Sequence, residues 1–163
     1  MDKILTLLEN DGHLSAEQIA VMLKKETGDI KKAIAKYESE GVILGYQALI
    51  DWDKTDREYA SAVIELKVVP QRDRGFDQVA AKIYQYPEVK SMYLMSGSYD
   101  LQLIIEGKTL REVATFVAEK LAPMDAVTST ATHFVLRKYK DKGVIFETPE
   151  KDEREKILIL EIT

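Results

Sequence analysis

Residues 59–69 read YASAVIELKVV and residues 89–106 read VKSMYLMSGSYDLQLIIE, and these two stretches decide the fold. In the first stretch, alternate positions place Ala62, Ile64 and Leu66 on one face and Ser61, Glu65 and Lys67 on the other. This period of two is typical of a β-strand with one buried face. In the second stretch, two apolar runs flank Ser-Gly-Ser, which predicts two antiparallel strands joined by a hairpin.

Helix signals separate these strands. Residues 76–86 are amphipathic and end at Pro87, while Thr109 and Glu112 form a capping box that opens a second helix. Residues 127–139 predict the last strand. The resulting order β-α-β-β-α-β predicts a ferredoxin-like domain, an antiparallel sheet with both helices on one face. Because the other face lacks a cover, we expect at least a dimer.

The first 45 residues predict three short helices and make the whole chain α+β. Asp2 is the expected N-cap of the first helix. Ser15 and Gln18 form a capping box at the start of the second. The third helix is expected over residues 27–40 and is closed by Gly41.

Three helices with a sharp second turn can form a helix-turn-helix, whose third helix enters the major groove of DNA. Ala20, and Ile30 ten residues later, match the core positions of this motif. Lysines lie opposite the apolar side of the third helix, where they can neutralise phosphates. An ordinary solvated lysine face is the alternative. The candidate DNA contacts are Lys24, Lys25, Thr27, Lys31, Lys32 and Lys36.

The charge of the chain is segregated along its 163 residues. The net charge is −5, yet residues 24–36 carry five lysines against two acids, a local charge of +3. Residues 147–161 are acidic instead, with no function that the sequence reveals. This pattern favours contact with nucleic acid through one basic patch rather than through the whole surface.

The absence of cysteine excludes disulfides, a cysteine zinc site and a thiol nucleophile, and it fits a reducing compartment. No apolar run approaches the roughly 18 residues needed to span a bilayer. We therefore expect a soluble cytoplasmic protein without membrane contact.

A second candidate site is the turn Ser-Gly-Ser-Tyr-Asp at residues 96–100. Backbone N–H groups in such a turn can hold a carboxylate, and Asp100 can pair with an ammonium group. Together they suit a free amino acid. A plain hairpin turn, with glycine supplying positive φ, is the alternative. The candidate effector contacts are Gly97, Ser98, Tyr99, Asp100, Thr130 and Thr132.

Signals for catalysis are weak. The sequence has no Ser-His-Asp order, phosphate-binding glycine loop or metal-ligand spacing. We expect His13 to cap a helix from its loop, and His133 to be a strand residue that is packed or exposed at a face of the sheet. We expect no enzyme activity, metal or cofactor. The alternatives left open are a small enzyme or metabolite sensor built on a dimeric α+β barrel, and a chromatin-like architectural protein.

Four segments resemble the Lrp/AsnC (feast/famine) family of transcriptional regulators. They are Asp11-Gly12-His13-Leu14-Ser15 with Ile19-Ala20, Tyr37-Glu38 to Gly41-Val42-Ile43 with Gly45-Tyr46, Ser96-Gly97-Ser98-Tyr99-Asp100-Leu101, and Thr132-His133-Phe134-Val135-Leu136. Together they run over nearly the whole length of the chain.

The resemblance implies four regions. They are a helix-turn-helix domain at 1–45, a linking strand and hinge at 46–57, a ferredoxin-like effector and oligomerisation domain at 58–140, and an extension at 141–163. It also implies that double-stranded DNA is a partner and that homodimers form through the sheet. These dimers would assemble to an octamer, with amino acid effectors held between dimers near the 97–100 turn.

The chain departs from the family pattern at two places. Lys24-Lys25-Glu26 stands where an apolar turn ending in serine is usual, and the third helix lacks the common arginines. Lysine contacts phosphate as a point charge, whereas arginine reads guanine with two hydrogen bonds, so the operator sequence stays open. Asp125-Ala126-Val127 replaces a frequent Gly-Val turn.

Overall fold

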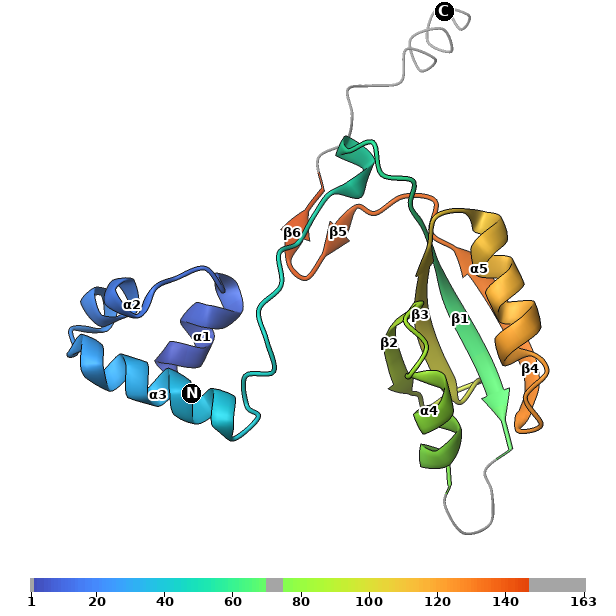
Figure 1. The fold of residues 1–163 in the computed structure, drawn as a ribbon, viewed down its shortest axis with the longest axis horizontal. Coiled ribbons are helices and arrows are strands. Elements are labelled where there is room, and N and C mark those ends of the chain that lie inside the picture. The colour runs from blue at the N-terminus through green and yellow to red at the C-terminus, as the bar shows by residue number, and fades with distance from the viewer. Residues whose placement is uncertain (1, 70–74, 147–163) are drawn as a thin grey trace, which may run out of the picture. The chain divides into compact units, whose positions relative to one another are not determined.

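The computed structural model describes residues 2–69 and 75–146, and the acidic stretch that begins at residue 147 lies outside these residues. The chain divides into two compact units, Met1–Ile50 and Asp51–Thr163, here named the N-terminal unit and the C-terminal unit. Figure 1 shows that the first is helical and that the second is built on a sheet.

The N-terminal unit contains α1 (Lys3–Asn10), α2 (Ala16–Leu23) and α3 (Thr27–Ser39). The predicted caps are confirmed. Asp2 accepts a hydrogen bond from the Ile4 N–H at 2.8 Å, and Ser15 and Gln18 form a reciprocal capping box. Each cap satisfies a backbone N–H that the first turn of a helix leaves unpaired. The short helices therefore begin where the sequence places them.

A small core joins the three helices. Its buried residues, among those described, are Ile4 of α1, Ile19 and Ala20 of α2, and Ile30 of α3. Ala20 and Ile30 are both buried, which confirms the predicted core positions of a helix-turn-helix. Because Ala20 has only a methyl side chain, α3 can pack closely against α2 at this point.

The segment after α3 differs from the prediction. Gly41, with φ of 69°, ends α3 as expected. However, residues 46–57 form no strand, and Trp52–Lys54 form one turn of 3-10 helix instead. A strand needs a second backbone to pair with, and no described segment pairs with this one.

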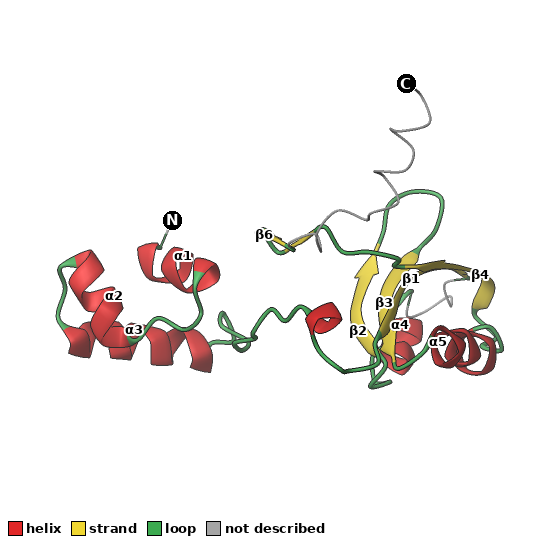
Figure 2. Ribbon diagram, turned by 90° about the horizontal axis from the view of Figure 1, so that it is seen from above, coloured by secondary structure: helices red, strands yellow, loops and turns green. Residues whose placement is uncertain are grey.

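The C-terminal unit is a four-stranded sheet with two helices. Its main elements are β1 (Ala60–Val68), α4 (Asp77–Ile83), β2 (Val89–Leu94), β3 (Leu101–Gly107), α5 (Leu110–Phe116) and β4 (Val127–Phe134). The strand order is β2-β3-β1-β4, and all neighbours are antiparallel. Figure 2 shows α4 and α5 on the same face of this sheet. The predicted ferredoxin-like order is therefore confirmed.

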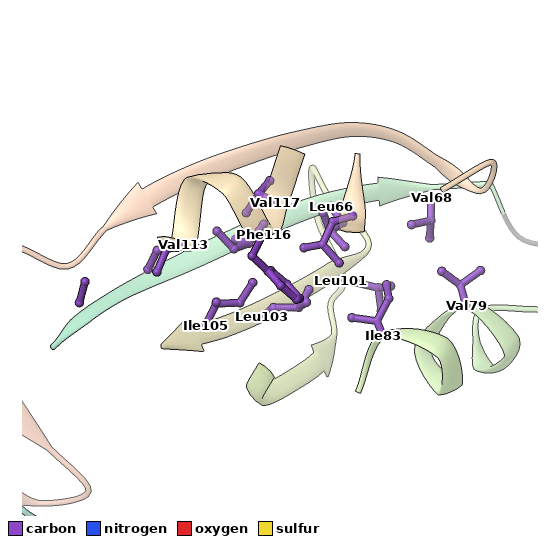
Figure 3. Packing of buried hydrophobic residues seen from close by; sticks show 14 residues of the cluster. Leu66, Val68, Val79, Ile83, Leu101, Leu103, Ile105, Val113, Phe116 and Val117 are labelled. Atoms are coloured by element: carbon purple, nitrogen blue, oxygen red, sulfur yellow. The ribbon is translucent and has the colours of Figure 1, made fainter. Parts of the chain in front are cut away.

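The core of this unit lies between the sheet and the helices. Figure 3 shows Phe116 and Val113 of α5 directed at the central strands, where Leu66 and Leu103 are fully buried. Ile83 of α4 is also fully buried. Burial of such side chains, at about 25 cal/mol for each Å² of apolar surface, is the main force that holds both helices on this face.

The start and the end of α5 are less regular than the sequence predicts. Thr109 accepts from the Glu112 N–H at 3.1 Å, but the Glu112 carboxylate accepts from the Lys108 N–H at 2.7 Å rather than from Thr109. The capping box is therefore only half formed. After α5, the chain continues directly into a π-helical turn, Val117–Leu121.

The last predicted strand is shorter than expected. β4 ends at Phe134 rather than at residue 139, and a separate small hairpin follows, formed by β5 (Lys140–Asp141) and β6 (Val144–Ile145). β4 pairs with β1, and the last residue pair between the two strands is Phe134 opposite Ala62. The Val135 N–H still donates to the Ser61 carbonyl at 2.9 Å, and the regular pairing ends there.

Candidate DNA interface and effector site

The lysines of α3 form an exposed face. Lys31, Lys32 and Lys36 are all exposed, on the side of the helix away from the buried Ile30. The spacing of one helical turn between Lys32 and Lys36 places both charges on the same side. The structure therefore brings these candidate contacts together.

The turn between α2 and α3 carries the other candidates. Lys24 ends α2 in the left-handed conformation, with φ of 53° and ψ of 49°. A residue with a side chain reaches this region at a cost, so the tight turn stores some strain. Lys25 follows it and is exposed, and Thr27 is the half-buried first residue of α3.

Two of the α3 lysines already have ion-pair partners. Lys31 Nζ lies 2.7 Å from Glu17 Oε1, and Lys36 Nζ lies 3.8 Å from Glu40 Oε1. The hydrogen bond from Lys31 lowers the pKa of the Glu17 carboxyl. In contrast, Lys32 has no ion pair in the described part of the chain, so its charge is fully available to a phosphate.

The 96–100 turn is fixed to the end of β1 by hydrogen bonds. Gly97 has φ of 153°, a backbone region that residues with a side chain rarely adopt. The Asp100 N–H donates to the Leu66 carbonyl at 2.9 Å, and the Asp100 carboxylate accepts from the Val68 N–H at 2.8 Å through Oδ2. The contact engages one oxygen of the carboxylate and leaves Oδ1 without a partner among the described residues.

A hollow of about 220 Å³ lies beside this turn. Its lining residues are Glu65, Lys67, Ser98, Tyr99, Ser129 and Ala131. The Tyr99 hydroxyl donates to Gln102 Oε1 at 2.9 Å, which fixes the ring at the edge of the hollow. Ser98 and Tyr99, two of the candidate effector contacts, therefore border this hollow, whereas Gly97 and Asp100 are not among its lining residues.

Thr130 and Thr132 do not lie in this hollow, which corrects the predicted grouping. They pair directly with Leu66 and Ile64 of β1, both fully buried under the helices. Residues directly opposite one another on antiparallel strands have side chains on the same face. The two threonines therefore face the helix side, whereas the hollow lies on the uncovered side.

Sequence reasoning missed the neighbours that line the hollow from the strands. Glu65 and Lys67 of β1 pair with Ala131 and Ser129 of β4, and all four side chains lie on the uncovered face. The alternation of polar and apolar residues in β1 already places Glu65 and Lys67 on the face away from the core. This pattern could have identified them as residues of the uncovered face. Residues 127–132 gave none, because small and polar residues occupy both faces of β4.

Other kinds of site find little support among residues 2–69 and 75–146. Within these ranges, no group of three or more His, Asp or Glu side chains is arranged to hold a metal ion. None of the helices described has the length and apolar character needed to cross a membrane. His133 is exposed and lies 3.5 Å from Glu65, at the uncovered face of the sheet.

The two units define a class of protein, a helix-turn-helix followed by a ferredoxin-like ligand-binding domain. Residues 61–145 match the family model of the Lrp/AsnC ligand binding domain. The chain is also 46% identical over 153 residues to YugG of Bacillus subtilis, an uncharacterized HTH-type transcriptional regulator, covering 93% of this chain and 92% of that one. The chain belongs to the Lrp/AsnC family of transcriptional regulators.

More distant relatives agree with this assignment. The proline dehydrogenase transcriptional activator of Rhizobium radiobacter is 23% identical over 87% of this chain and 90% of its own. Among solved structures, the regulator NMB0573 of Neisseria meningitidis, in complex with L-Met, has a TM-score of 0.70 at 22% identity and covers 86% of this chain and 93% of that one. AsnC of E. coli has a TM-score of 0.65 at 18% identity, covering 91% and 94%.

Proposed function

We propose that this protein is a DNA-binding transcriptional regulator without catalytic activity, which acts in the cytoplasm and whose assembly or DNA affinity responds to a free amino acid. The observation that carries the DNA half is the exposed lysine face of α3, together with the charged turn before it. The contacts with double-stranded DNA are assigned to Lys24, Lys25, Thr27, Lys31, Lys32 and Lys36. All six lie within one turn and one helix of a helix-turn-helix.

The effector half of the proposal rests on the 96–100 turn. Backbone N–H groups beside Gly97 and Ser98 hold the carboxylate of the amino acid, and the free oxygen of Asp100 holds its ammonium group. Tyr99 borders the hollow that receives the rest of the molecule. The L-Met complex of the Neisseria regulator supports an amino acid as the class of ligand.

The proposed assembly of several copies of the chain rests on the uncovered face of the sheet. Val63 of β1 pairs with Ile104 of β3 at its centre, and both are only half-buried in the single chain. A second copy covers this apolar centre and offers a backbone partner to the segment around Tyr46 and Leu49. The homodimer formed in this way assembles further to an octamer.

DNA binding is tested by fluorescence anisotropy with labelled duplex DNA at several salt concentrations. We expect the logarithm of the binding constant to fall linearly with the logarithm of the salt concentration, with a slope of about −0.9 for each phosphate contact. Retention of DNA on the protein without any salt dependence would contradict an interface made of lysines. Absence of DNA binding at low salt would contradict the proposal that the protein is a DNA-binding regulator.

The effector turn is tested by a thermal-shift panel of the twenty amino acids, followed by calorimetry on those that bind. An amino acid at 100 times its Kd is expected to stabilise the protein by about 2.7 kcal/mol. Asp100→Asn keeps an acceptor for the Val68 N–H but removes the charge, so it should weaken binding about ten- to a hundredfold.

Gly97→Ala serves as a second variant, because a Cβ at φ of 153° strains the turn without changing charge. It should also weaken binding at the turn, since the N–H groups move. Both variants should keep their affinity for DNA when no amino acid is present, because the two sites lie in different units. Equal affinity of Asp100→Asn and the wild type for every ligand would show that the turn is only a hairpin.

A further inference from the structure

The helix side of the C-terminal unit has a second and larger hollow, which the proposed function does not use. It lies between α4 and the loop that leads into β4, and its volume is about 520 Å³. Sites for small molecules usually have volumes of about 300–1,000 Å³. The lining residues are Gln78, Val79, Lys82, Gln85, Tyr86, Pro123, Met124, Asp125 and Ala126.

Opposite charges border this hollow without neutralising each other. Lys82 comes from α4 and Asp125 from the loop, and neither makes an ion pair or hydrogen bond within the described residues. Gln78, one helical turn before Lys82, and Gln85, just after α4, add two amide groups that also lack a hydrogen bond there. Two unpaired charges of opposite sign at one hollow are complementary to a molecule that carries both signs.

The remaining walls are apolar and well supported. Val79 is buried in the core, and Figure 3 shows it on α4 at the same end of the core as Val68. Tyr86 packs edge-on against Phe116 with ring centroids 5.3 Å apart, so its ring is held in place. Together with Met124, these side chains offer a preformed surface to an aliphatic or aromatic group.

We propose that this hollow is a second ligand site, which binds a zwitterionic free amino acid with an apolar side chain. Lys82 binds the carboxylate and Asp125 binds the ammonium group, while the side chain of the ligand packs on Val79, Tyr86 and Met124.

The loop that carries Asp125 is connected to the same end of β1 as the effector turn. The Val69 N–H donates to the Ala126 carbonyl at 2.8 Å, and Asp100 contacts Leu66 and Val68 just before it. A ligand that fixes this loop therefore acts on the strand segment that holds the turn. Occupation of one site should change the affinity of the other by the same factor in both directions.

The two sites can be separated by NMR of the full chain labelled at its methionine methyl groups. The chain has five methionines. Met124 lines the hollow on the helix side, and Met95 is next to the effector turn. The probes are the twenty free L-amino acids, added up to about 10 mM, which covers affinities into the millimolar range.

We expect at least one amino acid with an apolar side chain to shift the Met124 signal. Lys82→Ala and Asp125→Asn should each weaken that binding about tenfold or more. Lys120→Ala is the matched control, because Lys120 is an exposed lysine of the same unit that does not line the hollow. It should leave the affinity unchanged.

Several outcomes would overturn this second site. They are a Met124 signal that no amino acid shifts, a shift that persists with unchanged affinity in both variants, and a change in particle mass in the variants without a change in binding. The last outcome would make the surface a subunit contact. Shifts at Met95 alone would leave the proposed effector turn intact, whereas shifts at Met124 alone would support the second site and contradict the turn.

Discussion

The N-terminal unit has four buried apolar residues in its core, whereas the C-terminal unit has fourteen among its described residues. A domain is stabilised by roughly 0.05–0.15 kcal/mol per residue, so the free energy of unfolding of the N-terminal unit, Met1–Ile50, is only a few kcal/mol. The comparison indicates that helix caps and single core residues decide whether the N-terminal unit folds. The C-terminal unit can lose a core contact and remain folded.

The two units also differ in how they present their candidate sites. The N-terminal unit displays long, exposed lysines on a helix, and two of these lysines are held only by exposed ion pairs. In the C-terminal unit, the effector turn is held by backbone hydrogen bonds to β1. Binding at the first site is therefore expected to depend on charge and salt, and binding at the second to depend on geometry.

The largest expected effect comes from Ile30→Ala, which empties the centre of the small core. Such a change costs about 2–5 kcal/mol, comparable with the whole stability of the N-terminal unit. We expect loss of the α1–α3 helical signal in circular dichroism and loss of DNA binding, with the C-terminal unit still folded. Leu103→Ala, at an equally buried position of the larger core, should leave both units folded at 25 °C. Two folded units in Ile30→Ala would contradict the comparison.

A smaller effect with the opposite sign is expected at the turn between α2 and α3. Lys24→Gly relieves the left-handed conformation, which costs about 1–2 kcal/mol for a residue with a side chain. The greater freedom of glycine in the unfolded chain offsets part of this gain, so we expect the N-terminal unit to be stabilised by about 0.5–1 kcal/mol in urea unfolding. DNA affinity should nevertheless fall, because a charge is lost. Lys25→Gly lacks the strain relief and should destabilise.

Lys32→Ala tests whether unpaired charge decides the DNA contact. The slope of log K against log salt should flatten by up to about 0.9, the contribution of one phosphate contact. Lys90→Ala, which removes an exposed lysine from the C-terminal unit, is the control and should not change the slope. An unchanged slope for Lys32→Ala in anisotropy titrations would show that Lys32 remains in solvent and does not contact a phosphate.

The smallest effect at neutral pH is expected from Tyr59→Phe. Burial, and then a hydrogen bond of 2.9 Å to Glu106, raise the pKa of Tyr59 to about 12 from an ordinary value of 10. A raised pKa in the folded state means that the contribution of Tyr59 is complete below pH 10 and is lost between pH 10 and about 12. The unfolding free energy of the C-terminal unit should therefore fall less steeply over this window in Tyr59→Phe than in the wild type. Equal slopes would show that Tyr59 titrates as it does in the unfolded chain.

Local signals in the sequence were sufficient to predict most of the fold. The caps at Asp2 and Ser15 were predictable because a cap depends on residues at most three positions apart. The alternation in β1 fixed its buried face because Ile64 and Leu66 differ sharply in polarity from Glu65 and Lys67. The exposed lysines of α3 followed in the same way from the position of Ile30 on the other side of the helix.

The sequence by itself thus determined the helices, the order of strands and the charged face, because each depends on neighbours in the chain. Only the tertiary structure decided which face of β4 meets the helices, since small and polar residues occur at both faces and the register with β1 separates Thr130 and Thr132 from the effector turn. It also decided that Asp100 binds the Val68 N–H, and that residues 46–57 do not form a strand. These outcomes depend on backbone partners that lie far away in the chain or are absent from it, and no local pattern of residues encodes them.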